Sequence, residues 1–136
     1  MALNTRFATA IHALVLLAAE PERLHTSEDL ARSLRTNSVV VRRILLQLQS
    51  AGLAKSHKGP GGGSKLARSA KKITLRDAHR AVYPEGLVDS HSVPAVSDVD
   101  SPLKAALGAA SRAYEEELEQ ITLSRLMKRA AKKRKR

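Results

Sequence analysis

Two groups of residues have the types and spacing needed to contact nucleic acid. Arg42 and Arg43 stand side by side in the amphipathic stretch 38–51, SVVVRRILLQLQSA. The segment 55–68, KSHKGPGGGSKLAR, sets basic residues around a glycine-rich reversal. Arginine can donate two hydrogen bonds to a guanine edge, lysine can neutralise a phosphate, and glycine lets a backbone come close to either. We therefore expect both groups to contact nucleic acid.

The glycine-rich run could instead be a nucleotide-phosphate loop, but its spacing argues against that use. A P-loop places a glycine directly before its lysine and leads from a strand into a helix. Here Ser64 separates Gly63 from Lys65, and short strands are expected on both sides. The sequence therefore indicates no nucleotide-hydrolysing enzyme, and we assign no catalytic residue.

A ligand-binding or metal-dependent enzyme is a second alternative. Its candidate ligands, Asp77, His79, Asp89 and His91, straddle Pro84 and lack the paired spacing that metal sites use. The chain has no cysteine, which excludes disulfides and thiolate-ligated iron-sulfur clusters. We expect no metal and no cofactor, and a small-molecule effector stays open.

The net charge of +11 is divided unevenly along the 136 residues. Residues 1–80 carry 14 basic and 5 acidic side chains, residues 81–127 carry 3 and 8, and residues 128–136 carry 7 and none. This division is typical of a nucleic-acid-binding module beside a separate protein–protein element. With only three aromatic residues, the chain has few rings on which single-stranded nucleic acid could stack.

The N-terminal part predicts two helices. Apolar residues recur at helical spacing over 3–19, and Pro21 ends that helix. Thr26 and Asp29 have the spacing of a capping signal, which predicts a second helix running to about Leu34.

A third helix follows after a short polar turn. Thr36 or Asn37 can cap it, and Gly52 stops it after Ala51, which completes a helix-turn-helix. One face of this helix is apolar, and the other is basic in its N-terminal half, the half that enters the major groove in helix-turn-helix docking. Whether its two arginines read bases or only touch phosphates stays open. The predicted major-groove residues are Asn37, Ser38, Val39, Arg42 and Arg43.

The glycine-rich segment predicts a β-hairpin wing. Strands are expected over 53–58 and 64–68, with a tight reversal at 59–63. A basic residue at such a tip can reach into a minor groove. The predicted minor-groove and backbone contacts are Lys55, His57, Lys58, Gly59, Pro60, Gly61 and Lys65.

We divide the chain into four regions. Residues 1–83 are the expected winged helix-turn-helix DNA-binding domain, closed by a helix that Thr74 caps. Residues 84–101 are expected to be a linker or effector loop, residues 102–127 a dimerisation helix, and residues 128–136 a disordered basic tail.

An apolar seam runs along the expected C-terminal helix, which Ser101 would cap and Pro102 begin. About 25 helical residues span about 38 Å, more than a domain of about 80 residues with its own core can cover. We therefore expect a two-fold homodimer, with packing inside one chain as the alternative. The predicted dimerisation residues are Leu103, Leu107, Ala110, Tyr114, Leu118 and Ile121.

Membrane insertion is not expected. The apolar run 13–19 is far shorter than the about 20 residues of a membrane-spanning helix, and no signal sequence is recognised. We expect a cytoplasmic protein with no membrane partner.

The stretch AGLAKSHKGPGGGSKLARSAKKITLRDAHRAV resembles the wing signature of the bacterial Rrf-two family of dimeric winged-helix transcription regulators. The resemblance covers about the first 83 residues well and the last helix more loosely. It implies that Lys58 enters a minor groove and that residues early in the third helix read the major groove. Cluster-binding members carry three cysteines after the wing domain, whereas the segment 85–101 has none.

Together these features predict a fold that is mainly α with a small β-wing: a winged helix-turn-helix plus a long C-terminal dimerisation helix. The expected function is that of a homodimeric, sequence-specific transcription regulator, acting as a repressor on palindromic double-stranded DNA. The alternative is a nonspecific architectural DNA- or RNA-binding protein.

Overall fold

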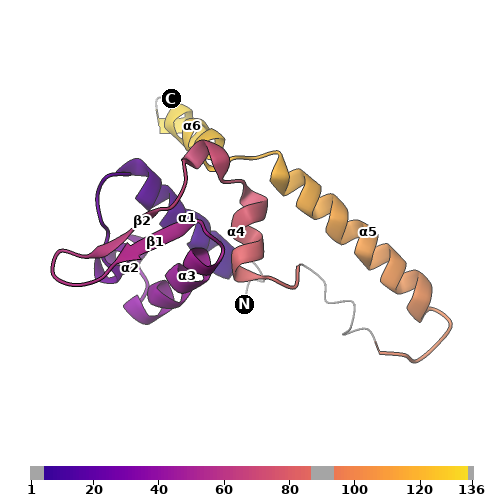
Figure 1. The fold of residues 1–136 in the computed structure, drawn as a ribbon. Coiled ribbons are helices and arrows are strands. Elements are labelled where there is room, and N and C mark those ends of the chain that lie inside the picture. The colour runs from indigo at the N-terminus through magenta and orange to yellow at the C-terminus, as the bar shows by residue number, and fades with distance from the viewer. Residues whose placement is uncertain (1–4, 87–93, 135–136) are drawn as a thin grey trace.

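The computed structural model describes residues 5–86 and 94–134 (Figure 1). Within them the chain forms six α-helices, one short 3-10 helix and one antiparallel sheet of two strands. The predicted fold class is confirmed. In chain order the elements are α1 (Thr5–Ala19), α2 (Ser27–Leu34), α3 (Ser38–Ser50), β1 (Ala54–His57), β2 (Gly63–Leu66), η1 (Ala70–Lys72), α4 (Leu75–Val82), α5 (Asp100–Glu119) and α6 (Leu123–Arg134).

Helix α1 is the centre of the core. It contacts α2, α3, α4, α6 and β2, while α5 projects away from these elements and has its main contact with α4 (Figure 1). The core is aliphatic, as the scarcity of aromatic residues requires, and Leu14, Leu17, Leu30 and Leu48 are fully buried. Burying each such side chain stabilises the fold by about 1.5–3 kcal/mol.

The helix-turn-helix forms through side-chain caps. The Thr26 hydroxyl accepts a hydrogen bond from the Asp29 backbone N–H at 3.1 Å, and Asn37 Oδ1 accepts from the Val40 N–H at 2.9 Å. Between the helices Arg35 adopts a left-handed conformation with φ of 54°, which turns the chain sharply. These caps match the predicted helix starts, because the short polar side chains replace missing helical partners.

The wing is tied to the rest of the domain by a third segment of chain. His25 and Ser64 exchange backbone hydrogen bonds of 2.9 and 2.8 Å. A Cβ on Gly63 would lie 2.7 Å from the His25 carbonyl oxygen, so a side chain there would push this segment away. The strands are shorter than the predicted 53–58 and 64–68, because their ends belong to the loop after α3, the hairpin turn and the approach to η1.

The region predicted as one helix over 102–127 is two helices. Three residues separate α5 from α6, and their backbone pairs with the segment before α4. The Leu75 N–H donates to the Ile121 carbonyl at 2.9 Å, and the Leu123 N–H donates to the Ile73 carbonyl at 2.8 Å. The single helix was a wrong prediction, because these hydrogen bonds and the complete burial of Leu123 replace a continuous helical ladder.

Helix α5 also begins two residues earlier than expected. Asp100, not Pro102, is its first residue, and the Asp100 carboxylate accepts hydrogen bonds from the backbone N–H groups of Val96 and Ser97. Pro102 lies in the first turn as predicted, where it removes no helical hydrogen bond.

The predicted disorder of the tail 128–136 is wrong for residues 128–134, which are the last two turns of α6. Thr122 Oγ1 accepts from the Arg125 N–H at 3.1 Å and begins this helix, while Met127 packs against the core. Basic residues in the last turn favour the negative end of the helix dipole. This part of the helix was not predicted from the sequence, because its charge composition resembles that of a flexible tail.

The predicted linker or effector loop, 84–101, is described only in part. Residues 84–86 and 94–99 are neither helix nor strand, and residues 87–93 lie outside the described part of the chain. Among the described residues, no helix combines the length and the apolar character that a bilayer crossing needs.

A buried histidine occupies the junction of α1, α4 and α5. His79 is 1% exposed, and its ring lies 5.1 Å from Phe7, 5.1 Å from Tyr83 and 5.2 Å from Tyr114. Within the described residues neither ring nitrogen has a hydrogen-bond partner. Burial lowers the pKa of His79, and the opposing attraction of Glu115 is smaller. His79 is thus part of the packing between helices, held in its neutral form.

We expect Leu123→Ala to lower the free energy of unfolding by about 2–5 kcal/mol, because it removes a fully buried side chain that anchors α6. Urea unfolding followed by circular dichroism measures this. Leu46→Ala is the matched control, because Leu46 is 63% exposed, and it should change stability by no more than about 0.5 kcal/mol. Equal effects of the two substitutions would contradict the packing of α6 on the domain.

We also expect stability to fall on acidification in a way that depends on His79. The unfolded chain binds a proton at the ordinary pKa of about 6.5, whereas the buried ring binds it only at lower pH. The contribution is therefore complete above this value and is lost as the pH falls below it. Unfolding measured from about pH 7 to pH 5 should show a shallower loss for His79→Phe than for the unmodified chain. His12→Gln, a change at an exposed histidine, should leave the steeper loss in place.

Candidate nucleic-acid interface

Helix α3 separates its apolar and polar residues as the sequence predicts. Val41, Ile44, Leu45 and Leu48 are buried against the core. The opposite face is open to solvent, and the predicted residues Val39, Arg42 and Arg43 lie on it together with Leu46. Val39 and Leu46 are large apolar side chains on this face, and they are 57% and 63% exposed.

Two of the predicted major-groove residues are at the start of this helix, and one has a structural task. Asn37 Oδ1 is engaged by the Val40 N–H at 2.9 Å, so its amide NH₂ group is the part left for another partner. Ser38 follows as the first helical residue and is half-buried.

Arg42 has a partner that the sequence did not reveal. Its Nη1 lies 3.3 Å from Glu28 Oε1 on α2, and both side chains are more than half exposed. An exposed ion pair of this kind contributes little stability, so a stronger partner can replace Glu28. Glu28 could be recognised in the sequence only as an acidic residue in the first turn of α2, and its contact with α3 needed the tertiary structure.

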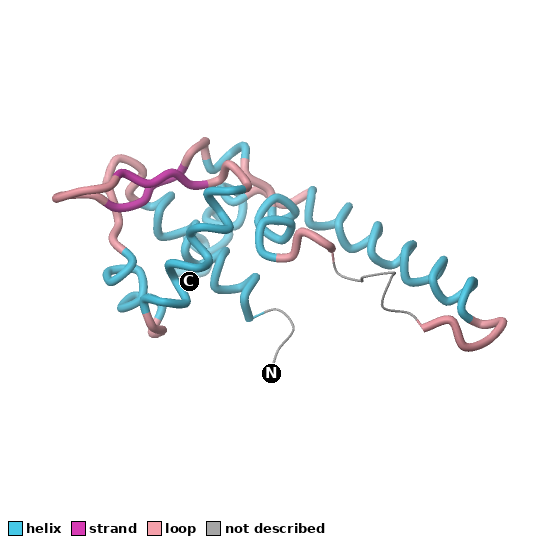
Figure 2. Tube along the Cα trace, turned by 60° about the horizontal axis from the view of Figure 1, so that its bottom comes forward, coloured by secondary structure: helices cyan, strands magenta, loops and turns pink. Residues whose placement is uncertain are grey.

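The turn at the tip of the wing extends beyond the helices, as Figure 2 shows. His57, Lys58 and Pro60 are exposed there, and the Gly62 N–H closes the turn onto the Gly59 carbonyl at 2.9 Å. A Cβ on Gly62 would clash with the His57 carbonyl oxygen. The glycine-rich run is thus required by the turn itself.

A cleft of about 260 Å³ lies between α3 and the hairpin. Arg42 and Lys58 line it from opposite sides, with Leu46 from α3. Polar residues that the sequence did not single out, among them Ser27 and Gln49, also line it. The structure therefore brings the arginine of α3 and the lysine of the wing to one concave surface.

The predicted wing residues do not all face this cleft. Lys55 and Lys65 are paired across the hairpin, and neither lines the cleft beside α3. Together with Arg68 they line a separate hollow of about 480 Å³ beside the end of α1. The alternation of side chains along strands causes this division, because buried Ala54 and Ser64 occupy the opposite, inward face.

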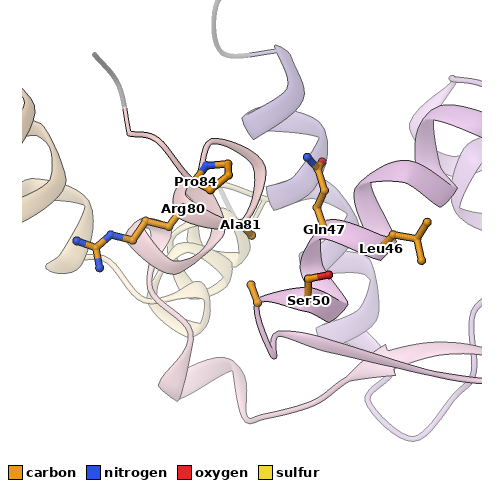
Figure 3. Close-up of a pocket in the computed structure, with 7 residues that line it drawn as sticks. Leu46, Gln47, Ser50, Arg80, Ala81 and Pro84 are labelled. Atoms are coloured by element: carbon orange, nitrogen blue, oxygen red, sulfur yellow. The ribbon is translucent and has the colours of Figure 1, made fainter. Parts of the chain in front are cut away.

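A third hollow, of about 410 Å³, lies between α3 and α4 (Figure 3). Leu46, Gln47 and Ser50 line it from α3, and Pro84 lines it beyond α4. Arg80 contributes its stem, while its guanidinium group points away and lies 3.1 Å from Glu115. Its described lining therefore lacks the convergent charged groups that acid–base catalysis would need.

The candidate metal ligands are used for other purposes. The Asp77 carboxylate accepts from the Thr74 N–H at 2.9 Å in a capping box, and His79 is enclosed by rings. Asp89 and His91 lie outside the described residues. Among the residues that are described, no three histidine, aspartate or glutamate side chains gather as a metal site.

Comparison with known proteins identifies the family. The profile of the Rrf2 family (Rrf-two above), described as an iron-dependent transcriptional regulator, matches residues 3–129. YwnA of Bacillus subtilis, which carries the description of an HTH-type transcriptional regulator, is 33% identical over 131 residues, covering 92% of this chain and 96% of its own.

Solved structures of other regulators are similar to this chain in fold. IscR from T. potens has a TM-score of 0.71 at 25% identity, covering 96% of this chain and 88% of its own. A transcriptional regulator from Lactobacillus plantarum has a TM-score of 0.78 at 25% identity, covering 92% of this chain and 89% of its own.

The iron in the family description does not fit the donor set of this chain as a thiolate-ligated cluster, because the chain has no cysteine. The predicted resemblance to the family itself is confirmed, and the description of its members is that of a regulator, not an enzyme. The family profile covers almost the whole chain, and a relative above 30% identity spans nearly all of both sequences. The chain therefore belongs to the Rrf2 family of DNA-binding transcriptional regulators.

Proposed function

We propose that this regulator is a homodimeric repressor that reads a palindromic DNA sequence. The observation that carries the proposal is the common concave surface formed by Arg42 on α3 and Lys58 on the wing. A helix and a hairpin tip at such a surface can enter a major groove and the adjacent minor groove at once, with the intervening phosphate backbone between them.

In this proposal the exposed face of α3 reads bases. Arg42 or Arg43 donates two hydrogen bonds to a guanine edge, and Val39 meets a thymine methyl group. Ser38 and the free amide NH₂ of Asn37 contact nearby bases or phosphates. On the wing, Lys58 enters the minor groove, while the glycine-rich turn brings its backbone close to the sugar-phosphate chain.

The ion pair between Arg42 and Glu28 makes this reading selective. On the correct sequence Arg42 exchanges Glu28 for a guanine edge. On a wrong sequence Arg42 makes weaker hydrogen bonds to the bases after it leaves Glu28. The unpaired Glu28 carboxylate is then repelled by nearby phosphates. Glu28→Gln should therefore strengthen binding to unrelated duplexes more than binding to the preferred one.

The support for a dimer is the state of α5. None of its residues is buried in the single chain. The six predicted seam residues divide into two halves. Tyr114, Leu118 and Ile121 are half-buried, with the Tyr114 ring against His79, whereas in the other half Leu103 is 41% exposed, Ala110 is open and only Leu107 is half-buried. We propose that the N-terminal half of α5, with Leu103, Leu107 and Ala110, packs on the same helix of a second copy.

A repressor of this kind acts by occupying promoter DNA. Two copies related by a two-fold axis present two α3 helices to successive major grooves, which demands a palindromic site. The absence of cysteine means that any effector of this chain acts by means other than a thiolate-ligated cluster.

To test DNA reading, duplexes are selected from genomic fragments, and affinity is then measured at several salt concentrations. We expect a steep salt dependence, about 0.9 log units of affinity per log unit of salt for each neutralised phosphate. Arg42→Gln should cost about 1–3 kcal/mol on the selected duplex and relax its base preference.

Lys58→Gln serves as the comparison, because it should weaken all duplexes alike and reduce the salt slope by about one for each protomer. Equal affinity for the selected duplex and a scrambled one would sink the sequence-specific proposal. It would favour a nonspecific architectural protein that binds DNA or RNA.

To test the dimer, Leu103→Glu is compared with Ala105→Glu by sedimentation equilibrium. Each change adds one negative charge at an exposed position of α5, but only Leu103 belongs to the proposed seam. Burying an unpaired carboxylate in the interface is costly, so Leu103→Glu should sediment as a single chain and Ala105→Glu as a dimer. A dimeric Leu103→Glu would place the interface elsewhere.

A further inference from the structure

Helix α6 presents an exposed basic face that the proposed contact surface of α3 and the wing tip does not use. The helix LSRLMKRAAKKR contains no acidic residue. Its apolar residues Leu123 and Met127 turn towards the core, and its cations are exposed. At helical spacing, the cations on the side of α6 opposite Leu123 and Met127 are Arg125, Lys128, Arg129 and Lys132.

This face has a fixed place on the DNA-binding domain. The Leu123 N–H donates to the Ile73 carbonyl at 2.8 Å, and α6 contacts η1 and α1. Figure 1 shows α6 beside η1, with α1 between α6 and α3. Helix α6 is therefore separated by α1 from α3, the helix that carries Arg42.

The basic face continues onto neighbouring elements. Lys71 and Lys72 of η1 are exposed beside α6. Arg68 lines the same hollow as Lys55 and Lys65, which lie on the outer face of the wing. Within the described residues, neither lysine of η1 nor any α6 cation has a carboxylate within 4.0 Å, although Arg68 lies 3.7 Å from Asp77. We call the two lysines of η1 and the four outward cations of α6 the α6–η1 surface.

Duplex DNA is the partner that this surface fits best. A membrane-binding amphipathic helix inserts its apolar face into lipid, but the apolar residues of α6 are packed against the core. A helix face of cations with no carboxylate within 4.0 Å among the described residues matches the closely spaced phosphates of a duplex and gains from the release of their counterions. Once α3 and the wing hold an operator, its flanks are also present at high effective concentration.

We propose that the α6–η1 surface binds backbone phosphates of the DNA that flanks the operator, so that the duplex bends past the wing towards α6. This inference rests on the proposed operator binding. The outer face of the wing, with Lys55 and Lys65, provides the path between the two surfaces. The regulator then protects a longer stretch of DNA than its base-reading residues span, and the flexibility of the flanks influences its affinity.

The test compares two forms of the selected duplex, one trimmed to the read sequence and one with about 20 further base pairs, or about 68 Å, on each side. Lys128→Gln/Lys132→Gln removes two charges from α6. Arg23→Gln/Arg112→Gln removes two exposed charges that lie outside both the α6–η1 surface and the proposed seam of α5, and is the matched control. Both variants lower the net charge of +11 equally. Affinity is measured between 50 and 200 mM salt.

On the long duplex we expect the α6 variant to have a salt slope shallower by about 3.6, for four phosphates across two protomers. Between 50 and 200 mM salt, the unmodified protein should therefore lose about a hundredfold more affinity for the long duplex than the α6 variant loses. On the trimmed duplex the α6 variant and the unmodified protein should bind alike, and the control variant should follow the unmodified protein on both.

Three results would overturn the inference. The flanks could leave the affinity of the unmodified protein unchanged, or the α6 variant could lose as much on the trimmed duplex as on the long one. The protein could also capture a second labelled duplex through α6, which would assign the surface to bridging. Failure of the proposed function is separate, because it appears as equal binding of selected and scrambled read sequences.

Discussion

Two backbone hydrogen bonds decide how the C-terminal third of this protein is arranged. They join Leu75 to Ile121 and Ile73 to Leu123, at 2.9 and 2.8 Å. Because this pairing occupies the peptide groups between α5 and α6, the chain cannot continue as one helix. Helix α5 therefore points away from the domain, and α6 packs back against the core. The exposed seam of α5 and the fixed basic face of α6 both follow from this pairing.

Helix α4 connects the base-reading element to the projecting one. It packs against α3 on one side and against α5 on the other. Towards α5 the contact combines the ring cluster around His79 with Glu115, which lies 3.1 Å from Arg80 and 3.5 Å from Arg76. The hydrogen bond from Arg80 lowers the pKa of Glu115 and keeps the carboxylate charged. The C-terminal half of α5 is therefore held by apolar and ionic contacts together, while Leu103 and Ala110 in its N-terminal half are exposed to solvent.

The wing has two chemically different sides because its strands are only four residues long and one face is buried. The tip and the α3 side place Lys58 opposite Arg42. The outer side places Lys55 beside Lys65 and continues towards η1. A single short hairpin thus separates two basic surfaces, and the reach of the protein along DNA depends on whether one or both are used.

The sequence by itself determined the elements whose signals are local. Caps at Thr26, Asn37 and Thr74, the 3.6-residue period of α3 and the glycine-rich turn act over a few residues, so the helix-turn-helix and wing could be predicted with their bounds nearly correct. The exposed position of Arg42 and Arg43 followed from the same period. For the same reason the family could be recognised from the wing alone.

Only the tertiary structure decided the features that depend on contacts between distant residues. The break before α6 requires pairing across almost 50 residues, and the helical state of residues 128–134 requires Leu123 to be buried. The ion pair of Arg42 with Glu28 and the enclosure of His79 likewise join separate helices. Local composition carries no record of such contacts, because their free energy comes from burial and hydrogen bonding between segments that meet only in the fold.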